Sequence, residues 1–240
     1  MSFDLTGLLL RLSVTVLPVI LAITLHEAAH GFVALRCGDD SAFQAGRVTL
    51  NPLRHIDLYG TILLPALLLA VSGGRFMFGY AKPVPVAYAR LRRPRRDMVL
   101  VAAAGPLTNL ALALVSALLL RLCAMASFGA DGAAATALGW IAANLYISIL
   151  INALLAVFNM IPLPPLDGGR VAVGLLPLSL AVPLARTERY GILVLIGLVV
   201  LIPMVASASG SHLDLLAYVV DRPLHWITDA MAWVSGMPHD

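Results

Sequence analysis

Three long apolar runs restrict what this chain can fold into. They cover about Leu8–Leu35, Met98–Cys123 and Thr136–Ile161. A helix needs roughly 20 residues to cross a hydrocarbon core about 30 Å thick, and inside that core the backbone polar groups must bond within their own segment. The chain is 60% hydrophobic and 12% charged, whereas a soluble domain is about 25% charged. We therefore predict an all-α polytopic membrane protein with about four to six membrane segments.

Three further apolar runs are shorter. Tyr190–Ala206 contains no charge, and we predict a fourth span there. Leu58–Val71 is flanked by glycines, and its length leaves a short span and a re-entrant segment both open. Val171–Leu184 is broken by Pro177 and Pro183, which favours a segment lying along the interface over a span.

The apolar runs suggest one domain and a tail. We expect residues 1–210 to form a single membrane-embedded domain, and 211–240 to form an interfacial tail. Leu213–Val234 mixes leucine and tryptophan with charged residues, which is typical of an amphipathic helix at a membrane surface, and Pro223 should interrupt it. Met1–Gly7 lacks the basic region of a signal peptide, so we expect the first span to be retained.

Two loops have recognisable patterns. In Gly38–Asp57, the residues Phe43, Val48 and Leu50 are spaced as in a short strand. In Tyr80–Val86 the prolines exclude the preceding residues from helix, so an extended, β-like segment is expected. Such a segment offers an edge that an extended peptide can pair with.

The basic residues are concentrated in one part of the chain. Ten of the sixteen Lys and Arg lie between Arg36 and Asp97, and Leu122–Ala137 has none. The positive-inside bias therefore places the first region in the cytoplasm and the second outside, and with one span before the basic region we expect the N-terminus outside as well. The run Arg90–Arg96 abuts a span and has no folded partner domain, so we expect no nucleic-acid partner. Cys37 and Cys123 form neither a disulfide framework nor a CxxC metal site.

An ionisable cluster lies inside the first apolar run. His26, Glu27 and His30 stand where charged groups are costly, which indicates a functional site. On a helix, residues four apart share one face, with their Cβ atoms roughly 6 Å apart. That spacing suits two imidazole nitrogens on one Zn²⁺, and the adjacent Glu27 can then act as general base on a water molecule.

A catalytic zinc usually takes three protein ligands. The candidates for the third are His55, Asp57 and Asp167, and the residues alone leave all three open. Asp167 follows a proline-rich break after the third long run. Unwound backbone at membrane depth occurs where protein or a water-filled cavity surrounds it.

Three motifs together resemble those of the site-2 protease family of intramembrane zinc metalloproteases. They are HEAAH at 26–30, GPLTN at 105–109, which we interpret as a turn with Gly105 and Pro106 at a helix start, and NMIPLPPLDGG at 159–169. The family carries HExxH on one helix and N-x-x-P-x-P-x-LDG on another. The resemblance implies that His26, His30 and Asp167 hold one Zn²⁺ per chain and that Glu27 is the general base.

The same resemblance implies an enzyme that hydrolyses peptide bonds within or near transmembrane segments of other membrane proteins. NPLRHID at 51–57 and AKPVP at 81–85 are similar to the small bacterial and archaeal members, and we expect no PDZ or CBS domain here. We therefore expect an integral protein of a bacterial or archaeal cell membrane. The HEAAH and LDG motifs can meet at one depth only if their two spans run in the same direction. With Met98–Cys123 as the one crossing between them, Leu58–Val71 should be re-entrant or shallow.

Simpler interpretations remain for several of these residues. The histidines would also suit a packed core pair, and His55 and Asp57 would also order the turn that contains them. Asn109 and Asn159 either bond between helices or position the substrate, as the family suggests. A protein that binds metal without cutting would keep the metal site but not need Glu27. A zinc transporter would need more ionisable residues in several spans.

Overall fold

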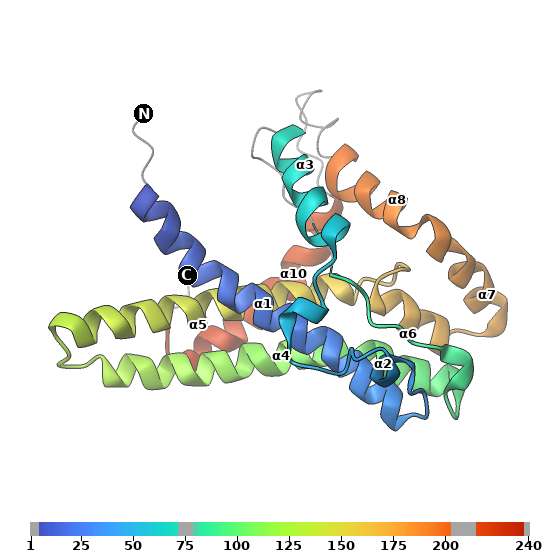
Figure 1. Cartoon of the computed structure of the whole chain (residues 1–240), viewed down its shortest axis with the longest axis horizontal. Helices are drawn as coiled ribbons and strands as arrows, with labels where there is room; N and C mark the ends of the chain where they lie inside the picture. Colours follow the sequence, from blue (N-terminus) through green and yellow to red (C-terminus); the bar gives the residue numbers. More distant parts are fainter. Residues whose placement is uncertain (1–4, 72–78, 80, 203–214, 238–240) are drawn as a thin grey trace.

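The computed structural model describes residues 5–71, 79, 81–202 and 215–237, and in these ranges it contains helices and no strand (Figure 1). Three helices are long and apolar enough to cross a membrane: α1 (Leu5–Arg36), α4 (Pro94–Ala126) and α5 (Gly132–Asn159). This agrees with an all-α membrane protein. The expected number of further membrane segments stays a prediction.

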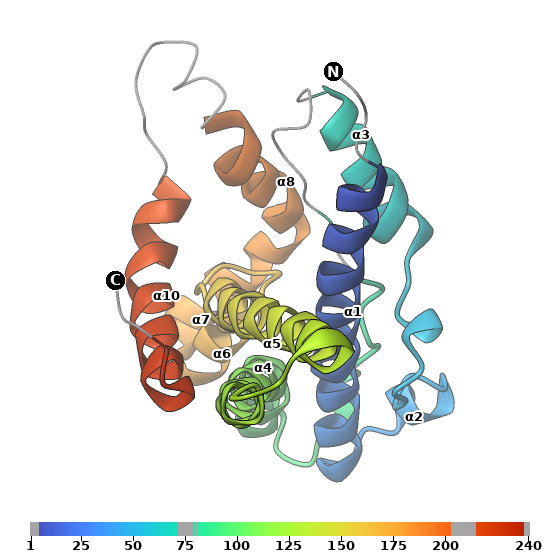
Figure 2. The same cartoon turned by 90° about the vertical axis from the view of Figure 1, so that its left-hand side faces the viewer.

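The helices pack around a central antiparallel pair. α4 and α5 lie side by side, and α1 crosses them on one side while α10 (Leu215–Ser235) lies on the other (Figure 2). Small side chains at the contacts are fully buried, among them Ala22, Ala102, Ala113, Ala117 and Ala153. Small residues let helix backbones approach closely, which is how helices associate in a bilayer.

The helix α4 begins earlier than the sequence suggested. Pro94 stands in its first turn, where the missing N–H has no intrahelical partner to lose, and the carboxylate of Asp97 accepts from the Arg93 N–H at 2.8 Å. Gly105–Asn109 therefore lies inside α4, and our interpretation of it as a turn was wrong. Glycine and proline are tolerated within a membrane helix when neighbouring helices surround it.

The shorter elements lie outside the central pair. Leu58–Leu63 (η2, a π-helix) and Leu64–Val71 (α3) together have 14 residues, about 21 Å at 1.5 Å per residue. The chain after α5 forms a series of short helices: α6 (Asp167–Leu175), α7 (Leu178–Arg186), η4 (Thr187–Tyr190), α8 (Gly191–Ile196) and η5 (Gly197–Leu201). Residues 203–206 of the fourth apolar run lie outside the described residues. The break between α6 and α7 falls at Pro177, as expected, while Pro183 lies inside α7.

The strand expected in Gly38–Asp57 was wrong. Ser41–Gln44 forms the short helix α2 and Pro52–Arg54 the 3-10 turn η1. The Asp39 carboxylate accepts from the Ser41 N–H at 3.0 Å, which starts a turn where the strand was predicted.

Two other expectations concern prolines. Tyr80, the first residue of the predicted extended segment, lies outside the described residues. Residues 81–87 have no helical turn, as predicted, but no strand within the described ranges pairs with them, and the 3-10 turn η3 (Tyr88–Arg90) follows. α10 runs through Pro223 without interruption, so the break predicted there was wrong. α10 packs against both α4 and α5.

Candidate metal centre

Three buried side chains from two distant parts of the chain meet at one point. His26 and His30 lie one turn apart on α1, and Asp167 stands in the first turn of α6. The Asp167 Oδ2 lies 3.2 Å from His26 Nε2 and 3.3 Å from His30 Nε2, and the two Nε2 atoms are 3.1 Å apart. Each residue is less than a tenth exposed. The candidate pair and one of the three candidate third ligands are thus brought together.

Hydrogen bonds on the far side of each ring fix where the imidazole protons lie. His30 Nδ1 is 2.7 Å from the Val101 carbonyl oxygen, which only accepts, so this nitrogen carries the proton. His26 Nδ1 is 2.5 Å from Asn109 Oδ1, while the amide nitrogen of Asn109 donates to Asn152 at 2.7 Å. With the proton on Nδ1, the neutral form of each ring would turn an Nε2 lone pair toward the other ring and toward Asp167.

This arrangement fits a divalent cation. Two lone pairs and a carboxylate oxygen without a hydrogen-bond donor converge in a buried space, and such groups repel one another unless a positive charge lies between them. Imidazole nitrogen and carboxylate oxygen are ligands that Zn²⁺ takes in catalytic sites. Outer partners such as the Val101 carbonyl and the Asn109 amide are the usual support for metal-binding histidines.

Close backbone approach at two places makes the cluster possible. A Cβ atom on Gly105 would lie 2.5 Å from both His26 Cε1 and His30 Nε2, so α4 can pass the two rings only with glycine there. Side chains on Gly168 or Gly169 would collide with the backbone of residues 160–164. The double glycine thus lets α6 begin directly after the proline-rich segment and places Asp167 beside the histidines.

Glu27 contacts the extended segment 81–87. Its Oε2 accepts from the Val84 N–H at 2.9 Å. The segment is tied down just before this contact, because the Lys82 N–H donates to the His55 carbonyl at 3.0 Å and the Arg47 guanidinium donates to the Lys82 carbonyl. The carboxylate of Glu27 is therefore held from outside α1 by a backbone donor.

Asp39 anchors the far end of the same segment. Its carboxylate is fully buried and accepts from the Ser41 N–H, the Ser41 hydroxyl at 2.6 Å and the Ala87 N–H at 2.6 Å. Burial raises the pKa of this carboxyl, but these hydrogen bonds favour the ionised form and hold the pKa below its usual value.

The other residues singled out from the sequence lie elsewhere. His55 Nε2 is 3.1 Å from the Thr49 carbonyl oxygen, and Asp57 accepts from the Tyr59 and Gly60 N–H groups at the start of η2. Asn159 donates to the Leu155 carbonyl within its own helix. Both cysteines are free.

Sequence reasoning missed Asn152, which supports Asn109. The available signal was an amide inside an apolar run, and amides there commonly bond between helices.

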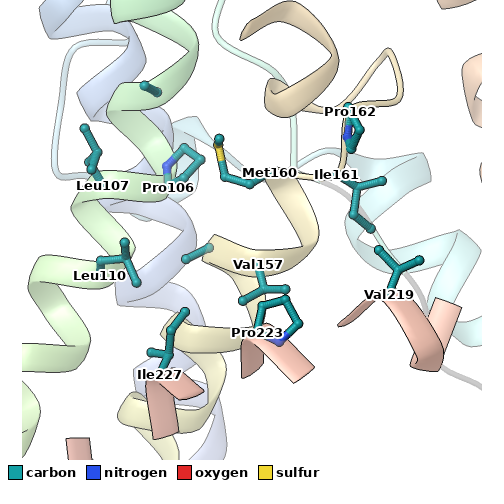
Figure 3. A pocket seen from close by; sticks show the side chains of 12 residues that line it. Pro106, Leu107, Leu110, Val157, Met160, Ile161, Pro162, Val219, Pro223 and Ile227 are labelled. Atoms are coloured by element: carbon teal, nitrogen blue, oxygen red, sulfur yellow. The ribbon is translucent and has the colours of Figure 1, made fainter. Parts of the chain in front are cut away.

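A separate cavity of about 410 Å³ lies between α4, α5 and α10 (Figure 3). Pro106, which follows Gly105, is in its wall, and Pro223 faces it from α10. The side chains lining it are all apolar: Ala103, Pro106, Leu107, Leu110, Ala156, Val157, Met160, Ile161, Pro162, Val219, Pro223 and Ile227. It therefore offers no group for hydrolytic chemistry.

Comparisons with known proteins cover nearly the whole chain. The model of Peptidase family M50 matches residues 14–131 and 122–204. A protein of Bacillus subtilis (strain 168), named "Putative zinc metalloprotease YwhC", is 38% identical over 211 residues, which are 85% of this chain and 91% of that protein.

Two mycobacterial relatives are named in the same way, as Rip2. The protein of Mycolicibacterium smegmatis is 30% identical over 75% of this chain and 64% of its own length. That of Mycobacterium tuberculosis (strain H37Rv) is 32% identical over 62% of this chain and 52% of its own length. No solved structure gives a significant match. The family model and the extensive identity agree with the motifs and with a buried cluster suited to Zn²⁺, and the chain therefore belongs to peptidase family M50, the site-2 protease family, and is a zinc metalloprotease.

Proposed function

We propose that this protein is an intramembrane endopeptidase that hydrolyses peptide bonds within or near transmembrane segments of other membrane proteins. The observation that supports this most is the convergence of two Nε2 lone pairs and the Asp167 carboxylate between helices apolar enough to span a bilayer. A hydrolytic site at that depth is accessible to peptide bonds that a soluble protease cannot reach.

Each residue of the cluster has a part in this proposal. His26, His30 and Asp167 hold the zinc ion, which when bound acts as a Lewis acid toward water and the scissile carbonyl. Glu27 takes the proton from the attacking water and returns it to the leaving amine. The Val84 N–H keeps one carboxylate oxygen of Glu27 in a fixed direction, so the base does not have to be oriented during the reaction.

The substrate must be unwound before it is cut, because the carbonyls of a helix are hydrogen-bonded along its axis. The segment 81–87 offers an extended backbone beside Glu27, and an unwound peptide can add to such an edge. Pro83 and Pro85 restrict this backbone to extended conformations. If it guides the substrate, replacing both prolines by alanine will reduce cleavage without removing zinc, and full cleavage by that variant would exclude this role.

The membrane arrangement follows the charge pattern. We place the basic region between Arg36 and Asp97 in the cytoplasm and the N-terminus outside, in a bacterial or archaeal cell membrane. His30 lies near the end of α1, and Asp167 follows the end of α5, so these two ends lie at the same level. α1 and α5 must then cross the membrane in the same direction. Because α4 already crosses once between them, Leu58–Val71 has to return to the side of the membrane from which it entered.

The test is cleavage of single-span substrates by the protein purified in detergent. Wild type, Glu27→Gln and wild type with a chelator are compared, and zinc is counted per chain. We expect about one zinc per chain and cleavage within the span, lost with chelator and reduced at least about 1,000-fold in Glu27→Gln, which removes the base but leaves the three ligands. Wild-type protein without bound zinc would refute the site, and cleavage by Glu27→Gln at the wild-type rate would refute the role of Glu27.

A further inference from the structure

A chain of hydrogen bonds runs from His26 across all three long helices. His26 Nδ1 on α1 meets Asn109 Oδ1 on α4 at 2.5 Å, and Asn109 Nδ2 meets Asn152 Oδ1 on α5 at 2.7 Å. Asn152 Nδ2 then meets the Ser148 carbonyl oxygen, one turn earlier on α5, at 2.9 Å. Asn109 and Asn152 are at most 1% exposed, so water does not compete for these bonds.

Two carbonyls determine the direction of the bonds in this chain: that of Ser148 at its end, and that of Ala22, which accepts from Asn109 Nδ2 at 3.4 Å. The Ser148 oxygen only accepts, so the NH₂ group of Asn152 faces it and the amide oxygen of Asn152 faces Asn109. Asn109 must then donate to Asn152 and present its own oxygen to His26. The proton of His26 consequently lies on Nδ1, and the lone pair on Nε2 faces Asp167 and His30.

The opposite orientation of Asn109 would disable the cluster. If its NH₂ group faced His26, Nδ1 would have to accept and the ring proton would move to Nε2. That proton would occupy the space where the Asp167 and His30 donor atoms meet, and His26 would no longer offer a lone pair to a cation. The oxygen of Asn152 opposes this, because two amide oxygens would then face each other at the shorter of the two contacts that the NH₂ group of Asn109 makes, 2.7 Å against 3.4 Å to the Ala22 carbonyl.

We propose that Asn152 is a positioning residue of the metal centre: acting through Asn109, it holds His26 in the tautomer and orientation that bind zinc. This inference rests on the proposed function, in which His26 is a zinc ligand. Asn152 does not itself touch the cluster. Its effect should therefore appear in the affinity for the metal. Replacing a residue that supports a metal-binding histidine in this way typically weakens metal binding about 10- to 100-fold.

The experiment measures zinc affinity of the full-length protein in detergent by competition with a chelator of known affinity, together with the absorption spectrum after replacement by Co²⁺. Asn152→Leu removes the acceptor while keeping the volume. The matched control is Asn144→Leu: Asn144 is also buried on α5 and donates to the carbonyl one turn earlier, that of Trp140, at 3.0 Å. We expect about 10- to 100-fold weaker zinc binding and an altered Co²⁺ spectrum for Asn152→Leu, and less than about 3-fold for the control.

A conservative variant separates positioning from packing. In its protonated form, Asn152→Asp donates to the Ser148 carbonyl and keeps an oxygen toward the NH₂ group of Asn109, so it should restore most of the zinc affinity that leucine loses. If Asn152→Leu does not fold, Asn152→Ser tests the same point, because a serine hydroxyl can bond the Ser148 carbonyl but is too short to reach Asn109. The thermal midpoints of the metal-free variants show whether any loss is one of folding.

The outcomes distinguish this inference from the function on which it rests. Wild type without zinc would refute the proposed function. Wild type with one zinc, and equal affinity in Asn152→Leu or Asn152→Ser, would overturn only the role of Asn152. An equal loss in Asn144→Leu would also overturn it, since the effect would then come from any buried amide of α5.

Discussion

Gly105 shows how one missing side chain determines the geometry of the cluster. It lies inside a helix, where glycine is less favourable than alanine by about 1 kcal/mol, yet a Cβ atom there would meet both imidazole rings at 2.5 Å. The rings stay in place because α4 has no side chain at this position and because the Val101 carbonyl, one turn earlier, accepts from His30.

Gly105→Ala should therefore damage the site more than the fold. The added methyl group must push the histidines away from Asp167, and displacement of about 1 Å at a reacting centre costs about 100-fold in rate. We expect at least this loss in cleavage, together with weaker zinc binding. Gly139→Ala on α5 is the control, because a Cβ atom there meets nothing within 4 Å. Equal activity of the two variants would contradict the steric argument.

The segment 81–87 is held at both ends by contacts outside the spans. Its two anchors are Asp39, which accepts from the Ala87 N–H, and Arg47, which donates to the Lys82 carbonyl. Glu27 bonds Val84 between them. An extended segment that is not paired with a strand depends on such side-chain contacts. The position of residues 81–87 therefore depends on the loop after α1, which carries Asp39 and Arg47.

The ionised form of Asp39 should stabilise the fold above about pH 4. Its pKa is lowered in the folded state, whereas the unfolded value is about 3.9. The stabilisation is therefore complete above the unfolded pKa and is lost as pH falls through the folded pKa. At neutral pH, Asp39→Asn should lower the free energy of unfolding by about 2 kcal/mol.

Thermal unfolding of the purified protein between pH 7 and pH 3 checks this. The difference between wild type and Asp39→Asn should be constant from pH 7 to pH 5 and shrink below pH 4. Asp40→Asn is the control, because Asp40 pairs with Arg90 at the surface and such pairs contribute at most about 1 kcal/mol. A difference that grows on acidification would contradict the assignment.

At the scale of the whole molecule, the cluster constrains the membrane topology. The proposal that Leu58–Val71 is re-entrant predicts that Phe43 and Gly79 lie on the cytoplasmic side, while Phe128, 95% exposed between α4 and α5, lies outside. Single cysteines at these positions, in a chain with Cys37 and Cys123 replaced, can be labelled with an impermeant maleimide in intact and permeabilised cells. We expect labelling at 128 in intact cells and at 43 and 79 only after permeabilisation. Labelling at 79 in intact cells would show that Leu58–Val71 crosses.

The sequence predicted features that depend on local spacing. The long helices and the pairing of His26 with His30 follow from apolar length and an interval of four residues. Asp167 was selected from three candidates only by resemblance, because its position depends on how α6 packs against α1. The strand around Val48 failed for a similar reason, since a strand needs a partner that local pattern does not supply. Asn152 was missed because its role depends on which face of α5 meets α4.

The bonds from His26 to Ser148 also bear on how the protein is made. Each long helix satisfies its own backbone, so α1, α4 and α5 can enter the bilayer separately and associate afterwards. Apolar contacts between helices are not directional, so they permit several shifts of one helix along another. The directional hydrogen bonds from His26 to Ser148 can all form at one alignment only. One alignment of α1, α4 and α5 therefore completes this row of bonds, and the bonds define how far each helix is shifted along its neighbours.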